Sequence, residues 1–163
     1  MIGNDVVDLA VAKKESNWQR KGFLDKIFTQ KEQLLITSAI SPEIMVWNLW
    51  SRKEAAYKIY NRETGIRGYF PLQIACNYDD ENSGSVAIKG RLYFTKTSIS
   101  STCIHTIALT NKDDFSRVEK VNSTDAIVKT NGIPFVVCKH STEVKPVSIS
   151  HHGAFWEGIT LMD

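Results

Sequence analysis

Glu54 and Lys58 are two residues whose types and spacing could do chemistry. They stand four positions apart in a helical pattern that runs from about residue 42 to residue 60, so they should share a helix face with Trp50, with Trp47 close by. A carboxylate and an ammonium held beside two indoles can form a surface ion pair worth about 0.2–0.5 kcal/mol. They can also belong to a functional site, and polar groups near both chain ends favour that second interpretation.

The helix that must carry this pair has clear boundaries in the sequence. Ser41 can cap free amides, Pro42 fits the first turn, and Glu43 meets the positive end of the helix dipole. The helix should end before Gly65, because residues 61–68 contain two glycines and no apolar period. We therefore predict one long central helix.

Two helical segments are predicted upstream of the central helix. Residues 10 to about 26 have a helical and markedly basic pattern, and a run of this kind is most often a solvated helix face. Thr29 and Glu32 have the spacing of a capping box and lead into an apolar run, which predicts a second, shorter helix.

Residues 1–9 have the pattern of a strand with apolar bulk and a glycine, Gly3, that permits an unusual backbone angle or a close approach. Asp5 and Asp8 lie an odd number of positions apart, so they should point to opposite faces of a regular strand. Only one of them should reach a site shared with Glu54. A solvated side chain or a cap for the following helix is the favoured interpretation of Asp8.

After Tyr69 the pattern becomes alternating or extended, which predicts strands and places the chain in the α+β class. The strands over residues 85–96 and 102–109 should pair in antiparallel fashion, and residues 111–124 should form a surface loop or short helix. The predicted strands cover residues 70–76, 85–96, 102–109, 133–139, 144–150 and 155–161.

Composition sets limits on the class of protein. A chain of 163 residues with 42% hydrophobic and 23% charged residues fits a single globular domain, residues 1–163. The net charge of +2 is too small to indicate nucleic-acid binding. No apolar run suits a membrane span or signal peptide, so we expect a cytoplasmic protein. Cys76, Cys103 and Cys138 fit small buried hydrophobic residues better than disulfides or a metal cluster.

Three motifs occur in the chain in a fixed order: Gly3-Asn4-Asp5-Val6, then Lys53-Glu54 with Lys58, then Ser148-Ile149-Ser150-His151. Together with the segment over residues 27–32, they resemble the 4'-phosphopantetheinyl transferases, in particular the small holo-acyl-carrier-protein synthase type. The resemblance covers roughly residues 1–77 and 131–161. It implies an N-terminal strand and helices followed by a mainly antiparallel sheet, with a strand-rich insertion at about residues 78–130.

The resemblance implies magnesium-dependent transfer of the 4'-phosphopantetheine arm of coenzyme A to a carrier-protein serine, with release of 3',5'-ADP. Asp5 and Glu54 would then hold Mg²⁺, which needs only one or two protein carboxylates. Lys58 would place its charge on a phosphate oxygen, and Glu54 would also accept the serine proton, directly or through a metal-bound water. His151 would bind a coenzyme A phosphate. Gly65 lies in a loop that is near the coenzyme in the family, although the inserted Arg67 departs from the family pattern.

The resemblance also implies partners. An acidic apo acyl or peptidyl carrier protein, from fatty acid, polyketide or peptide synthesis, would dock on the basic first helix, with the candidate patch Lys13, Lys14, Arg20 and Lys21. Members with a single unit of this small type assemble as trimers with sites built between neighbours, which predicts a homo-oligomer here. Two alternatives remain open: a non-catalytic module that binds coenzyme A or a carrier protein, and a magnesium-dependent phosphohydrolase.

Overall fold

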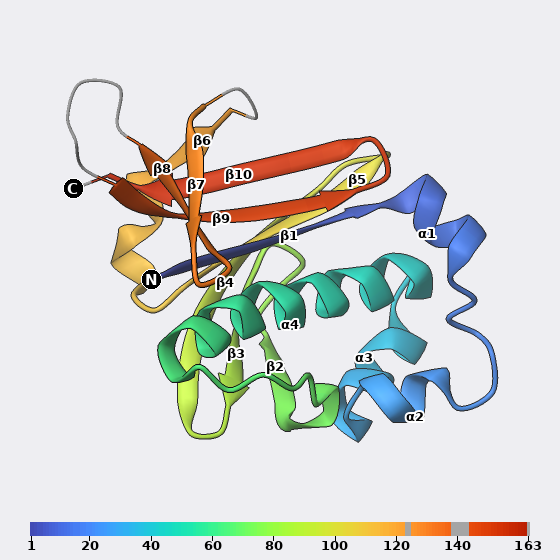
Figure 1. Ribbon diagram of the computed structural model, residues 1–163. Coiled ribbons are helices and arrows are strands. Elements are labelled where there is room, and N and C mark those ends of the chain that lie inside the picture. The colour runs from blue at the N-terminus through green and yellow to red at the C-terminus, as the bar shows by residue number, and fades with distance from the viewer. Residues whose placement is uncertain (123–124, 138–143, 163) are drawn as a thin grey trace.

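The computed structural model describes residues 1–122, 125–137 and 144–162, which form an α+β fold of two antiparallel sheets and four α-helices (Figure 1). The predicted fold class is therefore confirmed. Cys76 is buried and Cys103 half-buried, and both are free, whereas Cys138 lies outside the described residues. No helix in the described part of the chain is long and apolar enough to cross a membrane.

The first sheet contains the N-terminal strand at one edge, and every neighbouring pair is antiparallel. Burial alternates along its inner strands, as expected for a sheet with one face against a core. In spatial order its strands are β1 (Ile2–Asp8), β5 (Cys103–Leu109), β4 (Arg91–Ile99), β3 (Ser83–Ile88) and β2 (Ile74–Tyr78).

The second sheet lies on the other side of β1 from the long helix (Figure 1). A small apolar cluster of Ile2, Leu109 and Ile159 packs between the two sheets. In spatial order its strands are β6 (Val118–Val121), β10 (Phe155–Leu161), β9 (Val144–His152), β8 (Ile133–Val137) and β7 (Ile127–Thr130).

The central helix α4 (Pro42–Thr64) packs its buried residues against the first sheet and forms the main core there. It ends as predicted, because Gly65 adopts the left-handed conformation with φ 68°. The prediction for its start was wrong in one respect. Ser41 occupies the N-cap position, but its side chain makes no capping hydrogen bond.

The basic segment over residues 10–26 is not one helix. It forms α1 (Leu9–Glu15) and α2 (Phe23–Ile27), because the Asn17 side chain accepts the Gln19 amide in a turn and Gly22 adopts φ 80°. The capping box of Thr29 and Glu32 is confirmed at the start of α3 (Gln30–Ser38).

The predicted strand over residues 85–96 is in fact the hairpin β3–β4. Lys89 and Gly90 both have positive φ, 45° and 80°, so they form a two-residue turn that the sequence analysis did not anticipate. The predicted start of the strand at residue 70 was also too early, because a 3₁₀ helix, η1 (Pro71–Gln73), precedes β2. The antiparallel pairing of β4 with β5 is confirmed.

The polar region after β5 contains a short 3₁₀ helix, η2 (Lys112–Arg117), as expected, and also the unpredicted strand β6. Strand β7 was missed as well. The strand-rich insertion at about residues 78–130 remains a prediction, as does the single domain over 1–163. That segment contains β5, which pairs with β1 along its whole length.

Candidate functional site

Gly3 brings α4 close to β1 and thereby brings two motifs together. A Cβ atom at Gly3 would collide with the carbonyl oxygen of Ala55 and lie 3.1 Å from Cγ1 of Ile59. Alternate residues of a strand share a face, so Asp5 points to the same side as Gly3, toward α4. The close approach foreseen for Gly3 is therefore confirmed, and it places Asp5 beside the helix that carries Glu54.

Side chains of β9 hold the free edge of β1. The amides of Asn4, Val6 and Asp8 donate to Ser148 Oγ (2.9 Å), Ser150 Oγ (3.1 Å) and His152 Nδ1 (2.9 Å). Three alternate residues of β9 thus replace the backbone acceptors that a paired strand would supply. The residues between them, including His151, face away from these bonds.

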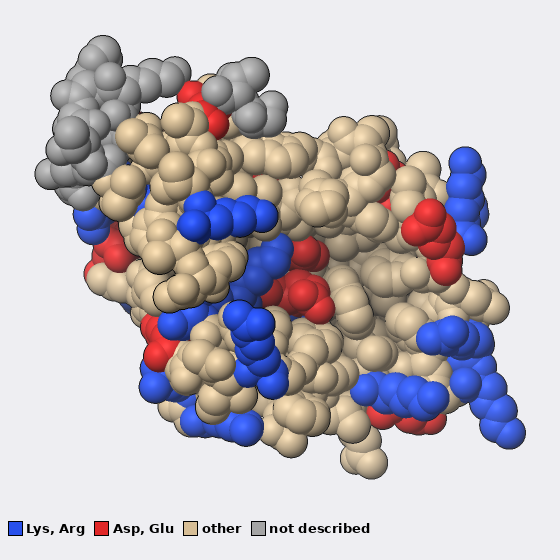
Figure 2. All heavy atoms as spheres, in the orientation of Figure 1, with Lys and Arg blue, Asp and Glu red and all other residues tan. Residues whose placement is uncertain are grey.

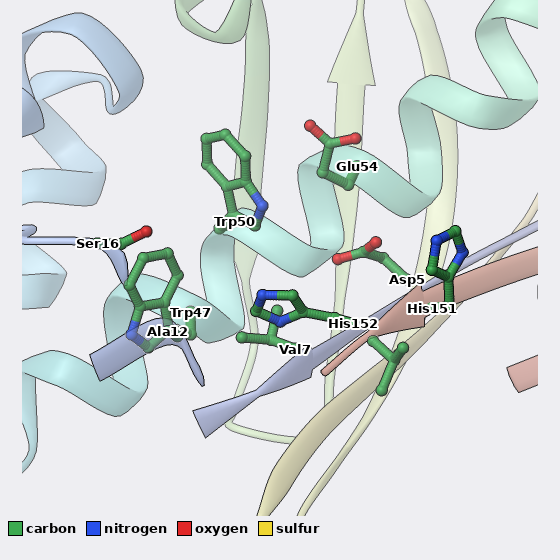
Figure 3. Close-up of a pocket in the computed structure, with 10 residues that line it drawn as sticks. Asp5, Val7, Ala12, Ser16, Trp47, Trp50, Glu54, His151 and His152 are labelled. Carbon is green, nitrogen blue, oxygen red and sulfur yellow. The ribbon is translucent and has the colours of Figure 1, made fainter. Parts of the chain in front are cut away.

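A cavity of about 380 Å³ lies where β1, α1, α4 and the end of β9 meet. Asp5, Glu54 and His151 line it, and Figure 3 shows the Asp5 carboxylate below Glu54, with His151 on one side. Trp47 and Trp50 line it too. In Figure 2, atoms of acidic residues lie beside atoms of basic residues in a hollow on this face of the molecule.

The charges in this cavity are poorly solvated. Burial, opposed by Lys58 and reinforced by Glu54, raises the pKa of Asp5 to about 7. Burial also raises the pKa of Glu54 and lowers the pKa of Lys58. The Asp5 side chain is 14% exposed and its Oδ1 lies 3.7 Å from Lys58 Nζ. Two desolvated carboxylates that share one ammonium make a site where an added cation would be stabilised.

Lys58 lies at the border of a second cavity. Its Nζ donates to the carbonyl oxygens of Asn4 (2.6 Å) and Ile149 (3.3 Å) and faces Asp5 Oδ1 at 3.7 Å. The second cavity, about 360 Å³, is lined by Lys58, Arg62, Lys129 and His151 among others. His151 lines both cavities, so an acidic cavity and a basic one meet at its imidazole.

An aromatic cluster flanks Glu54. Tyr69 packs edge-on against Trp50 and Tyr57, with ring centroids 5.9 and 5.1 Å away. The Tyr69 hydroxyl is buried without a hydrogen bond in the described part of the chain, as is Trp47 Nε1. Burial and the nearby Glu54 carboxylate raise the pKa of Tyr69, so its hydroxyl remains a proton donor. Tyr69 therefore lies close enough to Glu54 for its hydroxyl to affect that carboxylate.

Lys53 does not belong to the site. Its Nζ is fully buried, 2.7 Å from Glu32 Oε2, and also donates to the carbonyl oxygens of Ile27 and Pro71. Lys53 points to a different face of α4 from Lys58, whose Nζ contacts β1 and β9. Its ammonium joins α4 to α3 and to the segments around α2 and η1.

The other predicted residues divide clearly. Asp8 caps α1 through bonds from Ala10 and Val11, as favoured from the sequence. Gly65 is not among the residues that line either cavity, so its coenzyme contact remains a prediction. Sequence reasoning missed Ser150, Tyr69, Arg62 and Lys129. The alternation of Ser148, Ser150 and His152 was a usable signal for Ser150, because it shows which face of β9 meets β1.

The candidate docking patch, Lys13, Lys14, Arg20 and Lys21, is exposed. Lys13 and Lys14 lie in α1, whose Ala12 lines the acidic cavity. Basic side chains project at the right edge of Figure 2, where Figure 1 shows α1 and α2.

A family model described as the 4'-phosphopantetheinyl transferase superfamily matches residues 1–116. A holo-[acyl-carrier-protein] synthase of Caldanaerobacter subterraneus subsp. tengcongensis is 29% identical over 90 residues, which is 55% of this chain and 68% of that protein.

Two solved structures share the fold. Helicobacter pylori holo-[acyl-carrier-protein] synthase in complex with coenzyme A gives a TM-score of 0.53 at 17% identity, covering 67% of this chain and 98% of that one. The Neisseria meningitidis holo-[acyl-carrier-protein] synthase gives 0.51 at 21% identity, covering 66% and 94%.

Proposed function

The chain belongs to the 4'-phosphopantetheinyl transferase superfamily, which confirms the resemblance of its motifs, and we propose that it is a holo-acyl-carrier-protein synthase. In this proposal it transfers the 4'-phosphopantetheine arm of coenzyme A to a serine of an apo acyl or peptidyl carrier protein. The observation that carries the proposal is that Asp5, Glu54 and His151, from three distant motifs, line one cavity.

The donor set fits Mg²⁺. Asp5 and Glu54 supply two hard oxygen ligands, and burial raises the pKa of both, so a bound cation would stabilise their charged forms. In the part of the chain that the structure describes, no three His, Cys, Asp or Glu residues form a metal-binding group. Mg²⁺ suits such a sparse site, because it keeps several waters and also takes substrate phosphates. When bound, it would neutralise charge on the pyrophosphate.

The basic cavity suits the phosphates of coenzyme A. Lys58, Arg62 and Lys129 bring three cationic side chains to its wall, beside His151. The two carbonyl acceptors on Lys58 hold its ammonium in place at the border of this cavity. Lys58 would therefore donate to a phosphate oxygen whose charge increases as the leaving group departs.

Glu54 would accept the serine proton. The serine oxygen then bonds to the phosphorus that bears the pantetheine arm, and the bond from this phosphorus to the 3',5'-ADP oxygen breaks. The carrier serine would arrive from the side of α1, where the exposed lysines could meet an acidic carrier surface.

Mass spectrometry tests the proposal. The purified chain is mixed with coenzyme A, Mg²⁺ and an apo carrier protein, and the carrier should gain the mass of phosphopantetheine. No gain across several carriers would support a binding module instead, and release of 3',5'-ADP without a carrier would support a phosphohydrolase.

Three variants refine the test. Asp5→Ala and Glu54→Ala should abolish Mg²⁺-dependent transfer with the fold intact. Lys58→Ala should slow transfer by a factor on the order of 100 or more, as for a lost charge-stabilising contact.

A further inference from the structure

Ser150 differs from its neighbours on β9 in one respect. Ser148, Ser150 and His152 all accept an amide hydrogen of β1, but of these three only Ser150 also donates a hydrogen bond to an acidic side chain of β1 within the described part of the chain. The residue that precedes each bonded amide explains this, because it is Gly3 for Ser148, Asp5 for Ser150 and Val7 for His152. Of the three β9 side chains, Ser150 is thus the one whose β1 amide follows an aspartate, and Asp5 becomes its second hydrogen-bond partner.

The direction of the Ser150 bonds follows from counting protons. A serine hydroxyl has one proton and can accept two hydrogen bonds. The Val6 amide can only donate, so Ser150 Oγ accepts there at 3.1 Å. Its single proton is then left for Asp5 Oδ1, which lies 3.0 Å away. Because Ser150 is only 6% exposed, few waters can compete for this proton.

The two oxygens of Asp5 consequently have different surroundings. Oδ1 accepts from Ser150 and faces Lys58 Nζ at 3.7 Å. Oδ2 has no hydrogen bond to any residue in the described part of the chain, while the Asp5 side chain lines the acidic cavity. The hydrogen bond from Ser150 therefore fixes the rotation of the carboxylate and leaves one oxygen for a ligand.

We propose that Ser150 is a positioning residue that orients Asp5 for a divalent cation, an inference that rests on the proposed function. Partners of this kind, which hold a metal ligand in place, usually change metal affinity by about 10- to 100-fold when they are removed. Ser150 itself does not touch the cation or the substrate in this proposal. Its effect passes through the orientation of the Asp5 carboxylate.

Titration of the purified chain with Mn²⁺, followed by the electron paramagnetic resonance signal of free Mn²⁺, tests the proposal without any turnover. Ser150→Ala should weaken Mn²⁺ binding by about 10- to 100-fold. Ser150→Thr keeps the hydroxyl and should restore most of the affinity. Ser150→Cys, nearly the same size but a weak donor, should also weaken binding, and it serves if the alanine variant does not fold.

Ser148→Ala is the matched control, because it loses the same kind of bond to a β1 amide but no contact with Asp5. Ser148→Ala should lose about as much stability as Ser150→Ala but leave Mn²⁺ affinity unchanged. If Ser150→Ala and Ser150→Cys bind Mn²⁺ as tightly as the Ser148→Ala control, the positioning role is refuted. If Asp5→Ala itself binds Mn²⁺ normally, the cation site of the proposed function fails instead, so the two failures are distinguishable.

Discussion

Lys53 and Lys58 lie in the same motif, and Lys53→Met tests the different roles that the structure gives them. The three N–H bonds of Lys53 have three acceptors: Glu32 Oε2 at 2.7 Å and the carbonyl oxygens of Ile27 and Pro71, each at 2.9 Å. Both side chains of the ion pair are 0% exposed. Lys53 should therefore matter for folding and Lys58 for transfer.

The size of the effect follows from what Lys53→Met leaves behind. Glu32 would remain a fully buried charge with only the amides of Thr29 and Cys76 as donors. Breaking a buried ion pair by removing one partner costs about 3–5 kcal/mol of unfolding free energy. Since each kcal/mol shifts the Tm of a chain of this size by about 2–4 °C, we expect Tm to fall by roughly 6–20 °C.

Thermal and urea unfolding, followed by circular dichroism and tryptophan fluorescence, measure this loss. The double variant Glu32→Gln/Lys53→Met removes the unpaired charge, so it should recover at least half of the lost stability. Lys58→Met should cost less than roughly 2 kcal/mol, because it loses two carbonyl bonds at a partly exposed site, yet it should abolish most transfer. A Lys53→Met protein within about 1 kcal/mol of the parent would refute the reasoning about the buried pair.

Four further predictions follow from the site. Gly3→Ala should cost roughly 1–3 kcal/mol in urea unfolding, because its Cβ would push α4 away from β1, and an unchanged midpoint would contradict the close packing. The folded pKa of Asp5 is about 7 against 3.8, so between about pH 4 and pH 7 this carboxyl binds more protons in the folded chain than in the unfolded chain. The contribution of Asp5 to stability without divalent ions should therefore fall as pH rises through that window and level off above it, and comparison with Asp5→Asn, which should lack this contribution, measures it. His152→Ala should lower the free energy of unfolding by about 1–3 kcal/mol, because it leaves the Asp8 amide unpaired, and should retain coenzyme A affinity in calorimetry. His151→Ala should instead weaken coenzyme A binding and leave the free energy of unfolding nearly unchanged. Sedimentation should show a homo-oligomer, for which we predict a trimer, and a stable, fully active monomer would remove that prediction.

The parts of the site that the sequence could predict depend on short-range periodicity. The four-residue spacing of Glu54 and Lys58 fixes a shared helix face, and the odd spacing of Asp5 and Asp8 separates them on a strand. Both relations hold within a single element, so no knowledge of tertiary packing is needed. The capping box of α3 and the stop of α4 at Gly65 were predictable for the same reason.

The parts that could not be predicted depend on how elements meet. The contact of Ser150 with Asp5 joins residues 145 positions apart, and it uses side chains rather than a backbone ladder between β9 and β1. No local sequence pattern predicts such a contact. The break at Asn17 was missed because local turn chemistry, the Asn17 side chain accepting the Gln19 amide and Gly22 in the left-handed conformation, ended a helical pattern that continued on both sides.

The location of the site also bears on how it could be shared between subunits. The resemblance implied trimers whose sites are built between neighbouring subunits. Here the chain's own His151 lines the cavity that contains Asp5 and Glu54, because the bonds of β9 to β1 fix the imidazole next to that strand. A subunit of this chain therefore has all three groups before any assembly forms. In the proposed transferase, a neighbouring subunit is therefore not needed to supply the histidine.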